Sequence, residues 1–130
     1  MTQIAAIRRA ASMLMLLSAP ALAQDPPEEG SEAGQILFNN ACRTCHTVTE
    51  GDNRLGPHLH GVVGRQAGSL PDYTYSAAMA GSNIVWDAAN LDRFIENPEA
   101  VVPGNNMKPY TGLASPEERA RLIEFLGKAG

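Results

Sequence analysis

The feature that most constrains this chain of 130 residues is the run Cys42-Arg43-Thr44-Cys45-His46. Two thiols three positions apart, followed at once by a histidine, form the attachment signature for c-type haem. Each thiol can add across one haem vinyl group, and the imidazole of the next residue then becomes the proximal axial ligand of the iron. We therefore expect thioether bonds at Cys42 and Cys45, iron ligation by His46, and a fold that wraps one large flat cofactor.

Two cysteines at this spacing can also form a disulfide, a thioredoxin-like redox pair or half of a zinc site. A thioredoxin-like pair lies at the mouth of a βαβ unit, whereas the segment before Cys42 has helical spacing and no strand pattern lies nearby. A zinc site would need a second pair of ligands, for which only His58 and His60 are available. Haem attachment is therefore favoured, with a disulfide or zinc as the alternatives.

The N-terminal segment has the three parts of a secretory signal peptide. Arg8 and Arg9 give a positive start, residues 10–17 are apolar, and Ala21-Leu22-Ala23 has the small-x-small form of a cleavage site. The apolar stretch is too short to span a bilayer, which takes about 20 residues, and an uncleaved anchor is the alternative. We expect a soluble periplasmic protein with a cleaved signal at 1–23, a flexible leader at 24–30 and one haem-binding domain at 31–130.

Composition limits the class of partner. Loss of the two signal-peptide arginines leaves eight Lys and Arg against fourteen Asp and Glu. An acidic surface argues against nucleic acid or anionic lipid as a partner. The mature chain is one small domain, and only 5% of the chain is aromatic. The cofactor is therefore expected to supply part of the apolar core.

The periodicity of apolar residues predicts an all-α fold with long loops. Two helices have recognisable caps, at Asp87 and at Ser115-Pro116-Glu117-Glu118. Strand signals are nearly absent. The predicted helices run from Ser31 to about Cys42, over residues 75–80, from Asp87 to Asn97-Pro98 and from Ser115 to Gly127, with loops at 47–70 and 101–112.

Met107 is the best candidate for the second iron ligand. It lies between polar residues in a loop bounded by Pro103 and Pro109, where core packing gives no reason for a methionine. A thioether ligand stabilises ferrous iron and raises the reduction potential. Met79 lies among alanines and is better explained as core filler. The alternatives are His58 or His60, which would give bis-histidine iron of lower potential, and an open sixth position.

Taken together and in order, these motifs resemble class I cytochrome c, the family of small soluble carriers found in bacteria and mitochondria. The resemblance covers residues 32–129, nearly the whole mature chain. In chain order the motifs are Gly34-x-x-x-Phe38, Cys42-x-x-Cys45-His46, Gly56-Pro57-His58-Leu59-His60-Gly61-Val62-Val63-Gly64-Arg65, Tyr73-Thr74-Tyr75, Trp86, Leu91-x-x-Phe94-x-x-Asn97-Pro98 and Pro103-Gly104-x-x-Met107.

The resemblance implies a cytochrome c fold with about three main helices around one haem. It implies that the Pro57 carbonyl orients His46, and that Arg65, Tyr75 and Trp86 surround the haem propionates. A surface arginine and two core aromatics are the simpler explanations for these three. The resemblance also implies a contact between the first and last helices, made by Gly34, Phe38, Leu122 and Phe125.

Departures from the family pattern concern the haem surroundings. Phe94 stands where many members have a tyrosine, and Tyr110 follows Met107 one residue later than usual. The lysines that ring the haem edge in the mitochondrial proteins are missing, since Glu99 and Asn106 occupy matching places. Lys108 and Lys128 are the only lysines in the chain.

The resemblance implies a one-electron carrier and not an enzyme. Its partners would be a dehydrogenase, reductase or oxidase, without nucleic acid and without stable membrane insertion. Because charge steers such encounters, the missing lysines imply a partner surface that is not strongly acidic. A haem that binds peroxide or a gas, and an electron-accepting subunit of a larger dehydrogenase, are the alternatives.

Overall fold

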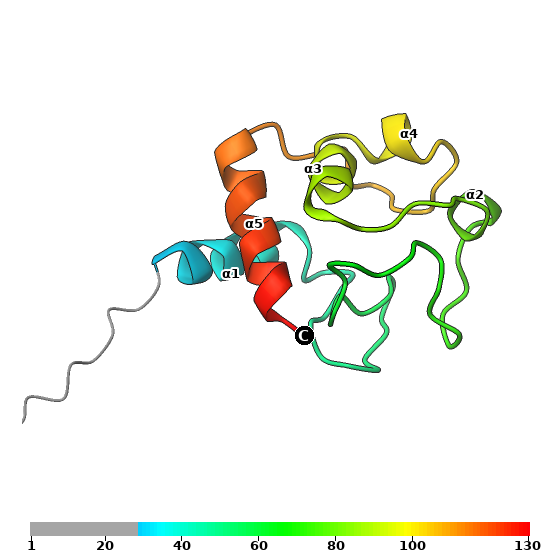
Figure 1. Ribbon diagram of the computed structural model, residues 1–130, viewed down its shortest axis with the longest axis horizontal. Coiled ribbons are helices and arrows are strands. Elements are labelled where there is room, and N and C mark those ends of the chain that lie inside the picture. Colours follow the sequence, from blue (N-terminus) through cyan, green and yellow to red (C-terminus); the bar gives the residue numbers. More distant parts are fainter. Residues whose placement is uncertain (1–28) are drawn as a thin grey trace, which may run out of the picture.

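Five helices and the connections between them make up residues 29–130, the part of the chain that the computed structural model describes (Figure 1). The predicted signal peptide and residues 24–28 of the predicted leader lie outside the described residues. Within residues 29–130 there is no strand, only an isolated bridge between Gln66 and Val85, which confirms the all-α prediction. The helices are α1 (Glu29–Ala41), α2 (Ala77–Ala80), α3 (Ala88–Glu96), α4 (Pro98–Val101) and α5 (Pro116–Lys128).

Helix α1 begins two residues before the predicted start at Ser31, so Glu29 and Gly30 are helical and do not belong to a leader. The added turn lies against α5: a Cβ atom on Gly30 would be 2.9 Å from a carboxylate oxygen of Glu124. Packing against α5, which cannot be predicted from the local sequence, therefore extends the helix beyond its expected cap at Ser31.

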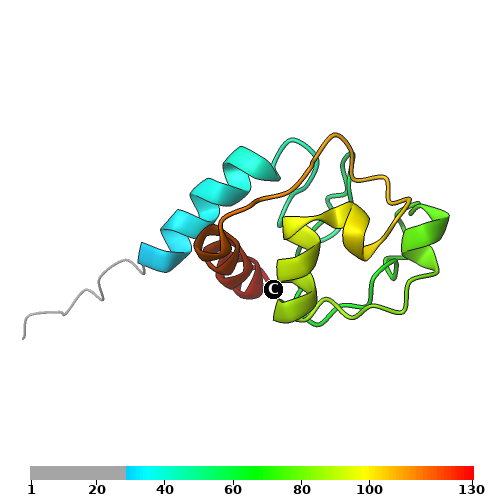
Figure 2. The same ribbon diagram turned by 90° about the horizontal axis from the view of Figure 1, so that it is seen from above.

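Helices α1 and α5 cross in close contact, as the views from the front and from above show (Figures 1 and 2). At the crossing a Cβ atom on Gly34 would meet the Arg121 carbonyl and lie 2.6 Å from Cβ of Phe125. The Phe38 and Phe125 rings stack at a tilt with centroids 5.6 Å apart, and Leu122 is only 1% exposed. The predicted contact between the first and last helices is confirmed.

The predicted caps of α3 and α5 are confirmed. Asp87 Oδ1 accepts from the Asn90 N–H at 2.7 Å, and Ser115 Oγ accepts from the Glu118 N–H at 3.3 Å. Each contact satisfies a donor that the first turn of a helix leaves free. Helix α3 buries Leu91, Phe94 and Ile95 as its spacing predicted.

Two details of the helices differ from the prediction. Helix α4, for which no helix was predicted, lies between the expected end of the preceding helix and the predicted loop at 101–112; Asn97 Oδ1 accepts from the Ala100 N–H at 3.2 Å, and Pro98 takes the first helical position. Asparagine followed by proline is a regular helix start, so the signal was present but the helix is only four residues long. Helix α5 ends at Lys128, one residue after the predicted stop at Gly127.

Arg119 joins three parts of the structure and was not recognised in the sequence. Its side chain is buried and pairs with Asp92 of α3 at 2.7 Å. It also donates to the carbonyls of Leu113 and Ala114, both at 2.9 Å. A buried guanidinium requires such partners, and here they tie α3 and α5 to the segment between α4 and α5.

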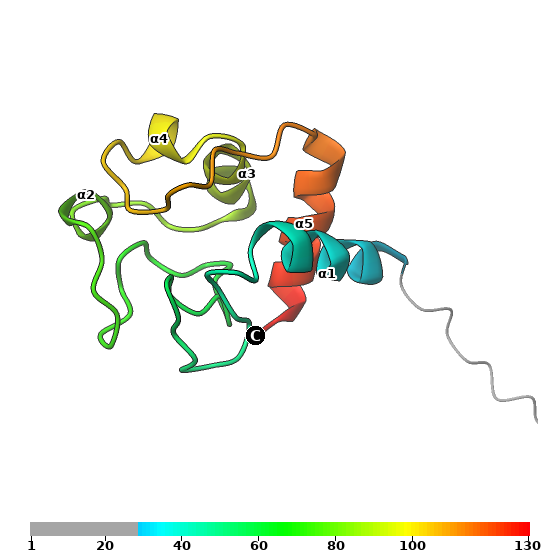
Figure 3. The same ribbon diagram turned by 180° about the vertical axis from the view of Figure 1, so that it is seen from behind.

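Two long connections face each other beside these helices. The segment between α4 and α5 lies above the loop that follows His46, in views from the front and from behind (Figures 1 and 3). That loop is tied to the segment before α3 by backbone bonds from Gly64 to Trp86, from Trp86 to Arg65 and from Ala67 to Ile84, of 2.7–2.8 Å. Among residues 29–130 no helix has both the length and the apolarity to cross a membrane.

Candidate functional site

A cavity of about 540 Å³ lies between the two long connections and the helices α1, α3 and α5. All seven residues predicted for the site line it: Cys42, Cys45, His46, Arg65, Tyr75, Trp86 and Met107. The rest of its wall is largely apolar and includes Val62, Leu91 and Phe94. An apolar cavity with a few placed polar groups is typical of a cofactor site.

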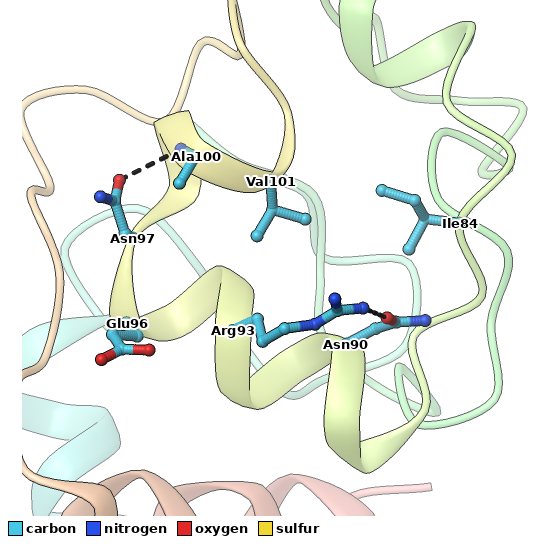
Figure 4. A pocket seen from close by; sticks show the side chains of 7 residues that line it. All are labelled: Ile84, Asn90, Arg93, Glu96, Asn97, Ala100 and Val101. Atoms are coloured by element: carbon cyan, nitrogen blue, oxygen red, sulfur yellow. Dashed lines mark hydrogen bonds between the residues drawn. The ribbon is translucent and has the colours of Figure 1, made fainter.

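A second hollow, of about 620 Å³, lies beside α3 and α4 (Figure 4). Arg93 in its wall donates to the Asn90 side chain, and Ile84 and Val101 supply the apolar part. No thiol, imidazole or thioether lines this hollow. The chemistry expected from the sequence is therefore found in the first cavity alone among the described residues.

The backbone of the motif places both thiols on the same cavity. Beyond α1 the chain makes another turn, in which the N–H groups of Cys45 and His46 donate to the Cys42 carbonyl at 3.0 and 2.9 Å. Residues three apart in such a turn lie on one side. The two cysteines are not joined in a disulfide, and no group of three or more Cys, His, Asp or Glu among the described residues could hold a metal ion. The disulfide and zinc alternatives are therefore not supported.

The partly buried position of Cys42 favours a neutral sulfur. Burial, and secondly the neighbouring Cys45, raises the pKa of Cys42 to about 11. The unmodified thiol is therefore protonated at neutral pH, and a thioether, which carries no charge, suits the same surroundings.

His46 is oriented by the loop that follows it. Its ring is 8% exposed, and Nδ1 lies 2.7 Å from the Pro57 carbonyl. This contact makes Nδ1 the protonated nitrogen and leaves Nε2 for a metal. Burial lowers the pKa of His46, with the Pro57 contact acting in the opposite direction, so the ring is neutral, as a ligand must be. Gly56 makes the approach possible, because a Cβ atom there would lie 2.7 Å from Nδ1.

Arg65 holds the same loop from within the cavity. Its guanidinium donates to the His58 carbonyl at 2.9 Å and to the His60 carbonyl, and burial lowers its pKa. The Tyr75 hydroxyl accepts from the Leu70 N–H at 3.3 Å. Arg65 is therefore a structural anchor of the loop, a role that neither the predicted propionate contact nor the alternative of a surface arginine included.

Trp86 is 7% exposed and packs against Phe94, with ring centroids 4.8 Å apart. Its backbone N–H and carbonyl both pair with the loop that follows His46. With Arg65 and Tyr75, it brings polar side-chain groups to a largely apolar wall. These are donors of the kind that partly buried carboxylates require, so the propionate role stays a prediction that the arrangement supports.

The rival ligands differ from Met107 in position. His58 and His60 do not line the cavity, whereas Met107 and Met79 do. His58 is 6% exposed and its Nδ1 has no hydrogen-bond partner, while His60 lies 4.0 Å from the Glu50 carboxylate. The cavity wall therefore offers methionine sulfur but neither of the two rival histidines opposite His46, and ligation by Met107 stays a prediction.

The segment between α4 and α5, which carries Met107, contains contacts that were not predicted from the sequence. The Met107 N–H donates to Asn105 Oδ1 at 2.9 Å, and the Asn105 side chain is buried. The Tyr110 hydroxyl donates to the Ile95 carbonyl at 2.6 Å, and burial raises the pKa of Tyr110 to about 12. Tyr110, which lies one residue further from Met107 than in the family pattern, thus anchors this segment to the end of α3.

Comparisons with known proteins agree with the cavity and the motif. A family model described as cytochrome c matches residues 31–129. Cytochrome c2 of Rhodopila globiformis is 45% identical over 101 residues, which cover 78% of this chain and 93% of that protein. Cytochrome c2 of Rhodomicrobium vannielii is 42% identical over 113 residues, 86% of each chain.

The fold has a relative among solved structures. Cytochrome cH from Methylobacterium extorquens superposes with a TM-score of 0.69 at 33% identity, covering 75% of this chain and 97% of that one. The chain therefore belongs to the cytochrome c family: it is an electron-transport protein that carries covalently bound haem c.

Proposed function

We propose that this protein is a soluble periplasmic one-electron carrier whose haem iron has His46 and Met107 as axial ligands. The observation that carries the proposal is that the imidazole, the thioether and both thiols line one cavity. When bound, haem c supplies an iron that changes between the ferric and ferrous states by one electron. With His46 and Met107 as its ligands, the iron would have no free site for a substrate, and for that reason we propose a carrier rather than an enzyme.

The chain's own residues would fix the cofactor in position and shield it from water. Cys42 and Cys45 would fix its edge, and the Pro57 carbonyl holds the His46 ring at 2.7 Å. The largely apolar wall would shield the iron from water. Arg65, Tyr75 and Trp86 would hydrogen-bond the propionates. A fixed ligand set limits the rearrangement that accompanies electron transfer.

A visible spectrum and a redox titration of the purified holoprotein test this proposal. We expect a reversible one-electron transition and, in the ferric protein, the weak band at about 695 nm that reports a bond from methionine sulfur to iron. The absence of that band with a low potential would indicate bis-histidine ligation. Rapid carbon monoxide binding would indicate an open sixth position and would favour a gas- or peroxide-binding protein.

We also propose that the partner is a redox protein, such as a dehydrogenase, reductase or oxidase, whose docking face is not strongly acidic. Lys108, the single lysine lining the cavity, is paired with Glu99 at 2.7 Å. Leu55 lines the same cavity and is 76% exposed. The cavity opening therefore combines an apolar side chain with a neutralised lysine, on a chain that is acidic as a whole.

Electron exchange with an oxidase adapted to basic cytochromes should be slower than that of a basic mitochondrial carrier. The physical reason is the missing attraction between positive carrier and negative oxidase, which normally speeds encounter. The two carriers would be compared by stopped-flow at low and at high salt, and raising the salt should narrow the difference. Equal rates at low salt would contradict the proposed partner surface.

Export to the periplasm rests on the predicted signal at 1–23. The mass of the mature protein tests it, since cleavage after Ala23 leaves a chain that begins at Gln24.

A further inference from the structure

The carboxylate of Glu99, in α4, accepts hydrogen bonds from three donors on the segment that carries Met107. Oε1 accepts from the Gly104 N–H at 3.0 Å. Oε2 accepts from the Asn105 side-chain amide at 3.2 Å and from the Lys108 ammonium at 2.7 Å. The three donors lie on both sides of Met107 in the sequence. One side chain therefore ties α4 to both sides of the ligand position.

Asn105 transmits this contact to Met107. Its side chain is 3% exposed, and its amide nitrogen also donates to the Val102 carbonyl at 2.9 Å. Its amide oxygen accepts from the Met107 N–H at 2.9 Å. Both ends of the amide are thus satisfied, as burial requires. A continuous path of hydrogen bonds runs from Glu99 through Asn105 to the Met107 backbone.

The charge of Glu99 strengthens this path. The Lys108 contact first, and then the Gly104 N–H, lowers the pKa of Glu99, so the group is ionised at neutral pH. An isolated surface ion pair contributes little. Here, however, one carboxylate binds three donors, and one of them belongs to a buried amide. Bonds to an ionised acceptor are also stronger than bonds between neutral groups.

We propose that Glu99 is a positioning residue, which holds residues 103–109 so that the Met107 sulfur stays at the iron. The inference rests on the proposed histidine–methionine ligation. Glu99 occupies the place of one of the lysines that ring the haem edge in the mitochondrial proteins. In this chain the residue at this position would hold the proposed ligand Met107 in place, and it would not attract an acidic partner.

The test compares Glu99→Gln with Glu124→Gln in the ferric holoprotein. Both substitutions remove one negative charge from an exposed glutamate paired with a lysine, since Glu124 lies 3.1 Å from Lys128. Glutamine at 99 keeps one acceptor oxygen, which can serve the Gly104 N–H, but it places a donor NH2 group where Oε2 accepts from Asn105 and Lys108. Imidazole is titrated against each protein while the band at about 695 nm is followed, because imidazole must displace methionine from the iron.

We expect imidazole to bind Glu99→Gln about five- to tenfold more tightly than the wild type, and Glu124→Gln like the wild type. Hydrogen exchange should also be faster at the Gly104 and Met107 amides of Glu99→Gln. Global unfolding by guanidinium is measured for both variants, because a merely structural role of Glu99 would lower stability without favouring imidazole.

Lys108→Gln removes the strongest donor and should move imidazole affinity in the same direction, which provides a second variant should Glu99→Gln fail to fold. Imidazole affinity equal to that of the wild type in the folded variants would overturn the role of Glu99 while leaving methionine ligation intact. Absence of the band in the wild type itself would instead overturn the proposed ligation.

Discussion

Replacing Met107 with alanine should open the iron of this protein to external ligands. The thioether lines the cavity that also contains the His46 ring, and alanine cannot reach the metal. The ferrous variant should then bind carbon monoxide and the ferric variant cyanide, both readily, and the band at about 695 nm should be lost. The reduction potential should fall, because a thioether favours ferrous iron and water or hydroxide does not. Stopped-flow mixing and a redox titration measure these changes.

Met79→Ala is the matched control. Met79 lines the same cavity, is partly buried and packs against the hydrophobic core. Its truncation should cost stability, about 2 kcal/mol for a methionine of this kind, while the spectrum keeps its methionine band. Unchanged carbon monoxide reactivity in Met107→Ala would reject Met107 as the ligand. Loss of the band in Met79→Ala instead would transfer the ligand role to Met79.

Gly34→Ala should lower stability by disturbing the crossing of α1 and α5. A Cβ atom there would meet the Arg121 carbonyl and lie 2.6 Å from Cβ of Phe125. Because one of these neighbours is backbone, α1 and α5 would have to move apart, and overpacking of this kind costs about 1–3 kcal/mol. The helix propensity gained with alanine, about 1 kcal/mol, reduces the net loss to at most about 2 kcal/mol. Guanidinium unfolding of the holoprotein should show the net loss.

Gly127→Ala supplies the comparison on the partner helix. Gly127 is helical and exposed, and the nearest atom to an added Cβ is in Val63 at 3.9 Å, an ordinary contact. Alanine should therefore stabilise the protein by up to about 1 kcal/mol. If both glycine variants shifted stability alike, the helix crossing would not be the reason for glycine at position 34.

The residues that sequence reasoning identified correctly are those whose chemistry depends on local spacing. A few neighbouring residues, within one or two helical turns, are enough to recognise each of these features. They are the Cys42 to His46 motif, the caps at Asp87 and Ser115, and the apolar face of α3. Resemblance to a known family added the placement of Arg65 and Met107. In the structure the thiols, His46, Arg65 and Met107 line one cavity, while their roles toward the haem stay predictions.

The residues that sequence reasoning missed depend on partners far along the chain. Arg119 pairs with Asp92, 27 residues away, and nothing in the sequence near either residue indicates the other. Asn105 and Glu99 looked like polar loop residues, because hydrogen bonds between α4 and the segment after it have no periodic pattern. The early start of α1 likewise follows from its contact with α5.

The meeting of α1 with α5 also determines how insertions in this chain affect its stability. Any residue added between these two helices lengthens the loop that folding must close. Because the entropy of closing a loop rises only with the logarithm of its length, even a doubling costs about 0.6 kcal/mol. The connections between them can therefore change length over evolution at little thermodynamic cost, provided that the segments facing the cavity keep their register.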